Sequence, residues 1–234
     1  MKKNLSIANP QAVEIAQSVI ASLRATTTAD QLSRHFEGLT FASDIRKRMQ
    51  GANYPRIGFR ISEADIDEMK NAGILEASSK EPFLSLSLSS GYKANGAPLT
   101  ALEKLLYAVC WKNKHLGKET HILRGVLGEN GDLNKGPVFY EFGRYLSGVN
   151  PFILDQHTLR VFILSLCVDD VTVNQVRELD QIKAVHSSWI AQHKQFFEEL
   201  ACVNTRDQDF FYLADRILFG AGSLLKTPRV RRRK

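Results

Sequence analysis

Apolar residues recur at intervals of three and four along most of this chain, a spacing that places them on one side of an α-helix. The clearest case is residues 137–147, where Pro137 stands just inside the start and Gly148 follows the end. A second apolar run begins after Asp155, which is typical of an N-cap residue. The sequence therefore predicts a mainly α-helical fold.

Capping signals predict further helices along the chain. The predicted N-caps are Asn9, Thr28, Ser43, Ser62 and Thr100. We expect residues 180–202 to form the longest helix, with Val185 on its core face. Strand-like alternation around residues 56–61, 74–77 and 83–89 adds a small antiparallel sheet in the N-terminal half to the expectation.

A chain of 234 residues can bury one core, with room for a small appended subdomain. The sequence pattern divides it into three parts. Residues 1–99 are a helical region with short strands, residues 100–225 form a second helical region, and residues 226–234 are a basic tail. No internal repeat is found.

The formal net charge of +6 is concentrated at one end. The tail holds six basic residues and no acidic one, so residues 1–225 carry 25 residues of each sign. Such a tail attracts phosphates without regard to base sequence, and a solubilising end or a contact for an acidic protein surface is the alternative. The tail residues that we expect to bind DNA are Arg229, Arg231, Arg232 and Arg233.

Several classes of protein are not indicated. No apolar run approaches the ~20 residues of a membrane span, and no signal peptide is recognisable. The spaced cysteines, which are Cys110, Cys167 and Cys202, are interpreted as buried thiols of a cytoplasmic protein. His186 and His193 are interpreted as surface or half-buried side chains. We expect no metal and no cofactor, because ligand spacings and nucleotide-binding glycine patterns are lacking.

Lys135 and Asp155 suggest a chemistry when they are taken together. Each lies at the start of a predicted helix, where partial positive charge lowers the pKa of a lysine and favours an ionised carboxylate. A free amine and a carboxylate can together break an N-glycosidic bond. Taken singly, each residue has a plainer interpretation, as a solvated lysine and as a helix cap.

The order of Lys135, a helix, an apolar loop and then Asp155-Gln156-His157 resembles the helix-hairpin-helix DNA glycosylases, most closely the 8-oxoguanine branch. The resemblance covers about residues 100–225. It implies a helical fold in which Lys135 attacks the sugar and Asp155 stabilises the developing positive charge. It also matches Asn113 to a position that faces the opposite DNA strand. His157 is matched to a DNA-binding position.

The resemblance extends to residues 211–219, which look like the last helix of that fold. It implies that Asp215 reads the edge of a guanine-type base and that Phe219 and Phe139 hold its two faces. The alternatives are core packing for both phenylalanines and a surface ion pair with Arg216 or another helix neighbour for Asp215.

The resulting prediction is a DNA glycosylase with AP lyase activity that acts on a damaged or modified purine-type base in double-stranded DNA. Residues 128–134 lack the glycine pattern of the family's hairpin, which favours a second class, a non-catalytic protein that only holds nucleic acid. The third class is a protein-interaction module, for instance in phage defence, and the neutral body favours it.

Overall fold

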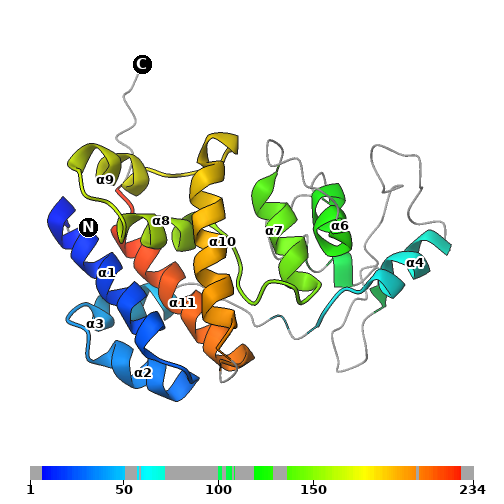
Figure 1. Ribbon diagram of the computed structural model, residues 1–234, viewed down its shortest axis with the longest axis horizontal. Coiled ribbons are helices and arrows are strands. Elements are labelled where there is room, and N and C mark those ends of the chain that lie inside the picture. The colour runs from blue at the N-terminus through cyan, green and yellow to red at the C-terminus, as the bar shows by residue number, and fades with distance from the viewer. Residues whose placement is uncertain are drawn as a thin grey trace. The chain divides into compact units, whose positions relative to one another are not determined.

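The structure is a computed structural model that describes residues 7–50, 57, 59–71, 100–101, 104–106, 108, 119–128, 136–203 and 206–227. The described part is mainly helical, which confirms the predicted fold class (Figure 1). No strand occurs among these residues. Of the three segments with strand-like alternation, the described residues 57 and 59–61 are not strand, and residues 74–77 and 83–89 lie outside the described part.

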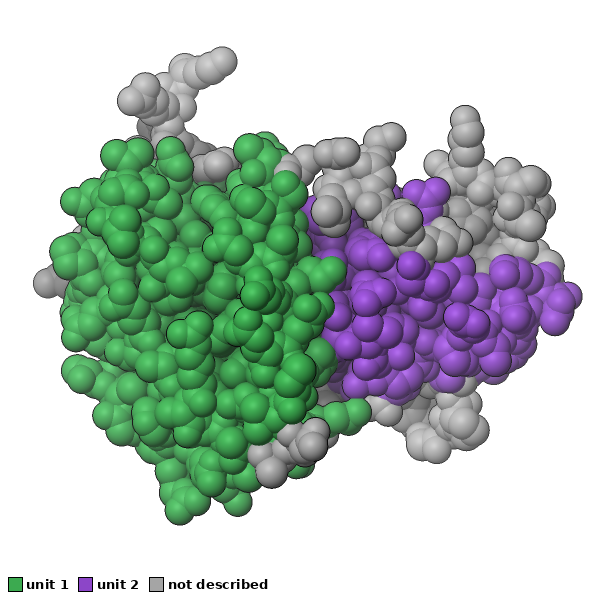
Figure 2. Space-filling model, in the orientation of Figure 1, with its two compact units in different colours: residues 1–56, 151–234 green, residues 57–150 purple. Residues whose placement is uncertain are grey.

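The chain forms two compact units, which Figure 2 colours separately. Unit 1 consists of residues 1–56 and 151–234, and unit 2 of residues 57–150. The boundary predicted at residue 99 adjoins residues 72–99, which the structure does not describe, and it stays a prediction. The helices of unit 1 are α1 (Asn9–Ala25), α2 (Ala29–Glu37), α3 (Ala42–Gln50), α8 (Gln156–Leu164), α9 (Asp170–Arg177), α10 (Ser187–Ala201) and α11 (Gln208–Leu225). Those of unit 2 are α4 (Glu63–Asn71), α6 (Glu119–Leu127) and α7 (Pro137–Leu146).

Several of the predicted N-caps are confirmed. The Thr28 side chain accepts from the N–H of Gln31 at the start of α2. The Ser62 hydroxyl accepts from the N–H of Asp65, whose carboxylate accepts in return from the N–H of Ser62 at 2.7 Å. Short side chains with an oxygen at this position satisfy N–H groups that have no partner inside the helix. These helix starts therefore depend on residues only three positions apart.

Two of the predicted N-caps are wrong. The cap of α1 is Ala8, and Asn9 is already helical. The Asn9 side chain instead donates to the carboxylate of Asp170 and to the side-chain oxygen of Asn174 on α9. Ser43 lies inside α3, which begins at Ala42. The Asn9 side chain thus makes a long-range contact with α9 instead of a local cap. The residues next to Asn9 in the sequence give no sign of this contact.

Helix α11 packs against α8, α3, α2 and α1, so it is the central helix of unit 1 (Figure 1). Two glycines let its neighbours approach closely. A Cβ atom on Gly220 would lie 2.9 Å from the carbonyl oxygen of Ile45 in α3, and one on Gly222 would lie 2.2 Å from that of His157 in α8. Real Cβ atoms do not come so near to backbone, so glycine is required at both helix crossings.

Arginine side chains complete the C-terminal ends of helices in unit 1. Arg206 donates to the carbonyl of Thr26, just after α1, and to that of Leu200 in α10, each at 2.9 Å from one of its nitrogens. Arg177 donates to the carbonyl of Leu225, the last residue of α11, at 3.1 Å. The last four carbonyls of a helix have no partner within it, and a cation near them is favourable. These two arginines therefore join helix ends to one another.

The predicted helix at residues 180–202 is shorter in the structure. Helix α10 begins only at Ser187, after a 3₁₀ turn η2 (Ala184–His186), and α11 is longer than α10. The N–H of Lys183 donates to the His186 ring at 3.0 Å within this preceding segment. Val185, expected on the core face, is 78% exposed. Its apolar spacing was misleading because the residue precedes the helix.

His193 of α10 is fully buried, which corrects its interpretation as a surface or half-buried residue. Neither ring nitrogen has a hydrogen-bond partner among the described residues. The rings that pack around it belong to Phe152, Phe162 and Phe197, with centroid distances of 5.3, 5.5 and 4.7 Å. Burial lowers the pKa of His193 to about 3, so the imidazole is neutral near pH 7.

Replacing this histidine should stabilise unit 1 and reduce its sensitivity to acid. Between the unfolded pKa of about 6.5 and the folded value of about 3, the unfolded state binds one more proton, so stability falls as pH decreases through this window. The slope from one such group is about 1.4 kcal/mol per pH unit. We expect His193→Leu to flatten the dependence of the unfolding free energy on pH, measured by denaturant titration between pH 7 and 4. Gln192→Leu, at the exposed neighbouring position, is the control and should leave the slope unchanged.

Unit 2 depends on two glycines where α6 crosses α7. A Cβ atom on Gly125 would lie 2.1 Å from the carbonyl oxygen of Tyr140, and one on Gly143 would lie 2.1 Å from that of Ile122. Each glycine thus faces the backbone of the opposite helix. The two helices pack with no side chain between them at this point, and any larger residue must separate them.

We expect Gly143→Ala to destabilise unit 2 although alanine is the better helix former. Forcing an extra carbon into a packed contact costs roughly 1–3 kcal/mol, and here the obstacle is backbone, which cannot turn aside. Chemical denaturation followed by circular dichroism measures the loss. The matched control is Gly38→Ala, where the new Cβ would lie 3.4 Å from the carbonyl oxygen of His35. Equal stabilities of the two variants would contradict this account of the crossing.

Candidate functional site

The residues predicted to form the site fall into three groups. Asp155, His157, Asp215 and Phe219 belong to unit 1 and are described. Phe139 is described in unit 2. The remaining predicted residues, which are Lys135, Asn113, Arg229, Arg231, Arg232 and Arg233, lie outside the described residues. The four residues of unit 1 come from two helices in direct contact, α8 and α11.

Asp155 is the N-cap of α8, as predicted. Its Oδ1 accepts hydrogen bonds from the N–H groups of His157 at 2.7 Å and Thr158 at 2.9 Å. The Thr158 hydroxyl accepts in return from the N–H of Asp155 at 3.1 Å, which completes a capping box. Both backbone bonds go to Oδ1, and the described residues donate no hydrogen bond to Oδ2. The carboxylate is thus held by one oxygen and half-buried.

Arg160 lies one turn further along α8 and is fully buried. Its guanidinium donates to the carbonyls of Val176 at 3.3 Å and Gly222 at 2.7 Å, and also to that of Leu179. Burial lowers the pKa of Arg160 to about 10, although the negative charges of Asp155 and Asp180 act in the opposite direction. The group therefore stays a cation at neutral pH and ties α8 to α9 and α11.

His157 contacts both this arginine and α11. Its Nδ1 is 3.1 Å from Nη1 of Arg160, and its ring meets the Phe219 ring edge-on, with a centroid distance of 4.7 Å and an interplanar angle of 60°. Burial lowers the pKa of His157, and the cations Arg160 and Lys226 act in the same direction. The Asp155 carboxylate and the Gly222 carbonyl act against them. The net effect favours a neutral ring.

Helix α11 supplies the other two described residues of unit 1. Asp215 is 5% exposed, so it does not lie at the surface, where the alternative had placed its ion pair. Phe219 is one turn later and partly exposed, and its ring contacts His157. The guanidinium of Arg216, the neighbour proposed as an ion-pair partner, stacks over the Tyr212 ring at 5.6 Å. The close approach at Gly222 is what brings the start of α8 onto this part of α11.

In unit 2, helix α7 begins at Pro137, two residues after Lys135. Its N-cap is Gly136, whose φ of +67° is in the left-handed region that favours glycine. The ring of His121 in α6 packs closely against this glycine. A Cβ atom on Gly136 would lie 2.7 Å from the ring, so there is no room for a side chain. Phe139 is 8% exposed, the burial expected of a core residue. The predicted start and end of this helix, at Pro137 and before Gly148, are confirmed.

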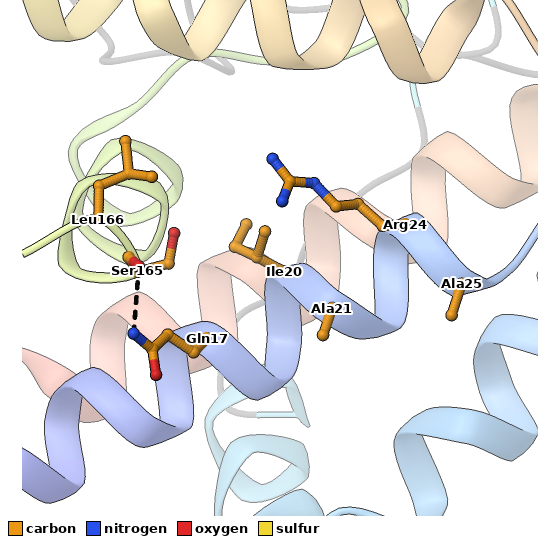
Figure 3. Close-up of a pocket in the computed structure, with 7 residues that line it drawn as sticks. All are labelled: Gln17, Ile20, Ala21, Arg24, Ala25, Ser165 and Leu166. Carbon is orange, nitrogen blue, oxygen red and sulfur yellow. Dashed lines mark hydrogen bonds between the residues drawn. The ribbon is translucent and has the colours of Figure 1, made fainter.

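A surface pocket of about 450 Å³ lies between α1 and the C-terminal end of α8 (Figure 3). Gln17 of α1 donates to the carbonyl of Ser165 at 3.5 Å, and Ile20, Arg24 and Leu166 also line the pocket. Asp155 and His157 lie at the other end of α8. None of the predicted site residues that the structure describes lines this pocket.

Burial removes equal numbers of positive and negative side chains from the surface of the described residues. The buried arginines are Arg160 and Arg177, and the buried acidic residues are Glu141 and Asp215. Lys226, the first basic residue of the tail, pairs with Asp180, and the N–H of Thr227 donates to the carbonyl of Arg177 at 3.1 Å. The first two tail residues are thus attached to the region around α9, and five basic residues follow them in the sequence.

Sequence reasoning missed Arg160 and Gly222, which position the start of α8. Both carried a signal, since each interrupts an apolar helical run with a residue type that such a run does not favour. It also misjudged Cys202, which is exposed, whereas Cys167 is buried as expected and Cys110 lies outside the described residues. Burial raises the pKa of the Cys167 thiol.

None of the described helices has the length and apolar character that crossing a membrane requires. The described residues also form no group of three or more His, Cys, Asp or Glu side chains suited to hold a metal ion. Comparison of the chain with protein-family models, with curated proteins and with solved structures found no match.

Proposed function

We propose that this chain is a DNA glycosylase with AP lyase activity that removes a damaged or modified purine-type base from double-stranded DNA. The observation that carries the proposal is the contact between α8 and α11. It brings a capping carboxylate, Asp155, and the edge-on pair of His157 and Phe219 to one end of α8. A carboxylate and an aromatic ring in one region are what the chemistry on an extruded nucleotide needs.

In the proposed reaction, the neutral amine of Lys135 attacks the sugar carbon C1′. A new N–C1′ bond forms while the N-glycosidic bond breaks, and the base leaves with the electron pair of that bond. The negative charge of Asp155 stabilises the positive charge that develops on the sugar. Opening of the sugar ring gives a Schiff base on Lys135, and β-elimination then cleaves the strand.

The proposed base contacts come from α11. Asp215 and Phe219 are four residues apart, so they lie on one face of the helix. An ionised carboxylate only accepts hydrogen bonds, which suits the N1 and N2 donors of a guanine-type base. Phe219, which is partly exposed, would stack on one face of that base. Extrusion is required because a side chain cannot reach these atoms within a duplex.

Borohydride trapping against a panel of duplexes with different lesions tests the proposal. Borohydride reduces a Schiff base to a stable amine, so the wild-type chain should form a covalent adduct with at least one duplex. Lys135→Gln should abolish this adduct while leaving DNA affinity nearly unchanged. The control is Lys47→Gln, at an exposed lysine of unit 1, which should trap normally. An adduct formed by the Lys135→Gln variant would assign the chemistry to another amine.

Asp155→Asn separates the cap from the charge. Asparagine is about as good an N-cap as aspartate, so the melting temperature should change little. The rate of base release should fall by two or more orders of magnitude, because the negative charge near C1′ is lost. The matched control is Asp169→Asn at the N-cap of α9, where the side chain accepts from the N–H of Thr172 at 2.8 Å. If both variants release the base at the wild-type rate, only the capping role of Asp155 is left.

Deleting residues 228–234 should remove most of the non-specific affinity. The deletion keeps the Lys226–Asp180 pair and removes Arg229, Arg231, Arg232, Arg233 and Lys234. Each phosphate contact contributes roughly 0.9 to the slope of log K against log salt. The slope should therefore become flatter by as much as about 4.5, with the choice of base unchanged. An unchanged slope would place the DNA-binding surface in the body.

A protein-interaction module is the second candidate function. It is favoured by three apolar side chains near the end of α8 and the start of α9, Leu166, Val168 and Val171, which are 48%, 97% and 68% exposed. Solvent-exposed apolar groups of this kind often mark a protein contact. A wild-type chain that binds no duplex and forms no adduct would favour this class over the glycosylase.

A further inference from the structure

The side chain of His157 faces a permanent hydrogen-bond donor. Nη1 of Arg160 lies 3.1 Å from its Nδ1, and the same Nη1 donates to the Gly222 carbonyl at 2.7 Å. The guanidinium is itself held by the carbonyls of Val176 and Leu179, so it cannot turn away without breaking bonds that anchor it. A guanidinium nitrogen carries only N–H groups and has no lone pair to offer.

This contact determines which ring nitrogen of His157 carries the proton. Because Nη1 can only donate, Nδ1 must accept, and a neutral imidazole with an accepting Nδ1 has its hydrogen on Nε2. A doubly protonated ring would set one N–H against another at Nδ1. The charged groups that act on the ring are Asp155, Arg160 and Lys226. The Gly222 carbonyl also attracts a ring N–H, but a hydrogen on Nδ1 would at the same time face the N–H groups of Nη1 at 3.1 Å, so the guanidinium favours the Nε2–H form.

We infer that Arg160 is a positioning residue that holds His157 as the neutral Nε2–H tautomer, so that the ring presents an N–H donor beside Phe219 to an acceptor oxygen of DNA. The acceptor is a phosphate oxygen or a base carbonyl, and this part rests on the proposed function. The tautomer itself does not depend on it.

The surroundings of the other ring nitrogen, Nε2, are compatible with a hydrogen on that atom. The side-chain nitrogen of Gln156 lies 3.5 Å from Nε2, at the outer limit of a hydrogen bond. A carboxamide can turn either its oxygen or its nitrogen toward the ring, so it can accept from Nε2–H when no better acceptor is present. A DNA oxygen at normal hydrogen-bond distance would replace it.

Nitrogen-15 NMR of the full chain with labelled histidine tests the tautomer directly. Long-range proton–nitrogen correlations distinguish a protonated ring nitrogen from an unprotonated one, and His157→Gln identifies the signals by their loss. At pH 7 we expect an unprotonated Nδ1 and a protonated Nε2. A proton on Nδ1, or on both nitrogens, would overturn the inference whatever activity the chain has.

Arg160→Lys tests the cause. Lysine keeps the charge but cannot reach three carbonyls and the ring together, so His157 should lose its single tautomer and show averaged nitrogen signals. The matched control is Arg206→Lys, which alters another guanidinium bonded to helix carbonyls, at the ends of α1 and α10. A His157 spectrum that is unchanged in a folded Arg160→Lys chain would contradict the role of Arg160. If that variant does not fold, the wild-type spectrum remains decisive.

Adding DNA separates the possible acceptors. A duplex with a stable abasic-site analogue should shift the Nε2–H proton signal if the acceptor is a phosphate oxygen. A shift seen only with a duplex that contains the target base would identify a base carbonyl. No shift with any duplex that the chain binds would overturn the donor role. Absence of a borohydride adduct would count against the glycosylase proposal alone, because it leaves the tautomer measurement unaffected.

Discussion

The buried guanidinium of Arg160 is the interaction on which the arrangement of unit 1 depends. A charge removed from water is costly unless polar groups surround it. Here the carbonyls of Val176, Leu179 and Gly222 supply those groups, from α11 and from the C-terminal end of α9 and the residues just after it. Carbonyls at a helix end carry partial negative charge, so they suit a cation. Three helices are thereby joined at one point, and removing the guanidinium would leave three acceptors unsatisfied in the interior.

The same arginine links the fold to the candidate site. Asp155 and His157 lie within the first turn before Arg160 on α8, so whatever holds Arg160 also holds them. Gly222 adds to this, because its missing side chain lets the start of α8 rest on α11. A site on the ends of packed helices is positioned more rigidly than one on a loop. Core packing at Arg160 and Gly222 therefore fixes the relative positions of the Asp155 cap, the His157 ring and the Phe219 ring.

Much of the helical pattern was predictable from sequence, because helix starts depend on neighbours three residues apart. Thr28, Ser62 and Asp155 cap their helices as predicted, and α7 runs from Pro137 to just before Gly148. Where prediction failed, a distant partner had intervened or the residue lay just outside its helix. The Asn9 side chain bonds to α9 instead of capping α1, and Val185 precedes α10.

The sequence by itself determined the helical class, the starts of α2, α4 and α7 and the position of Asp155 at the N-cap of α8, since these follow from local spacing and local hydrogen bonds. Only the tertiary structure decided which polar groups lie inside. It buried Arg160 among carbonyls and His193 among phenylalanine rings. It also set Gly125 against α7. The physical reason is that burial depends on which helix faces meet, and that choice involves residues far apart along the chain.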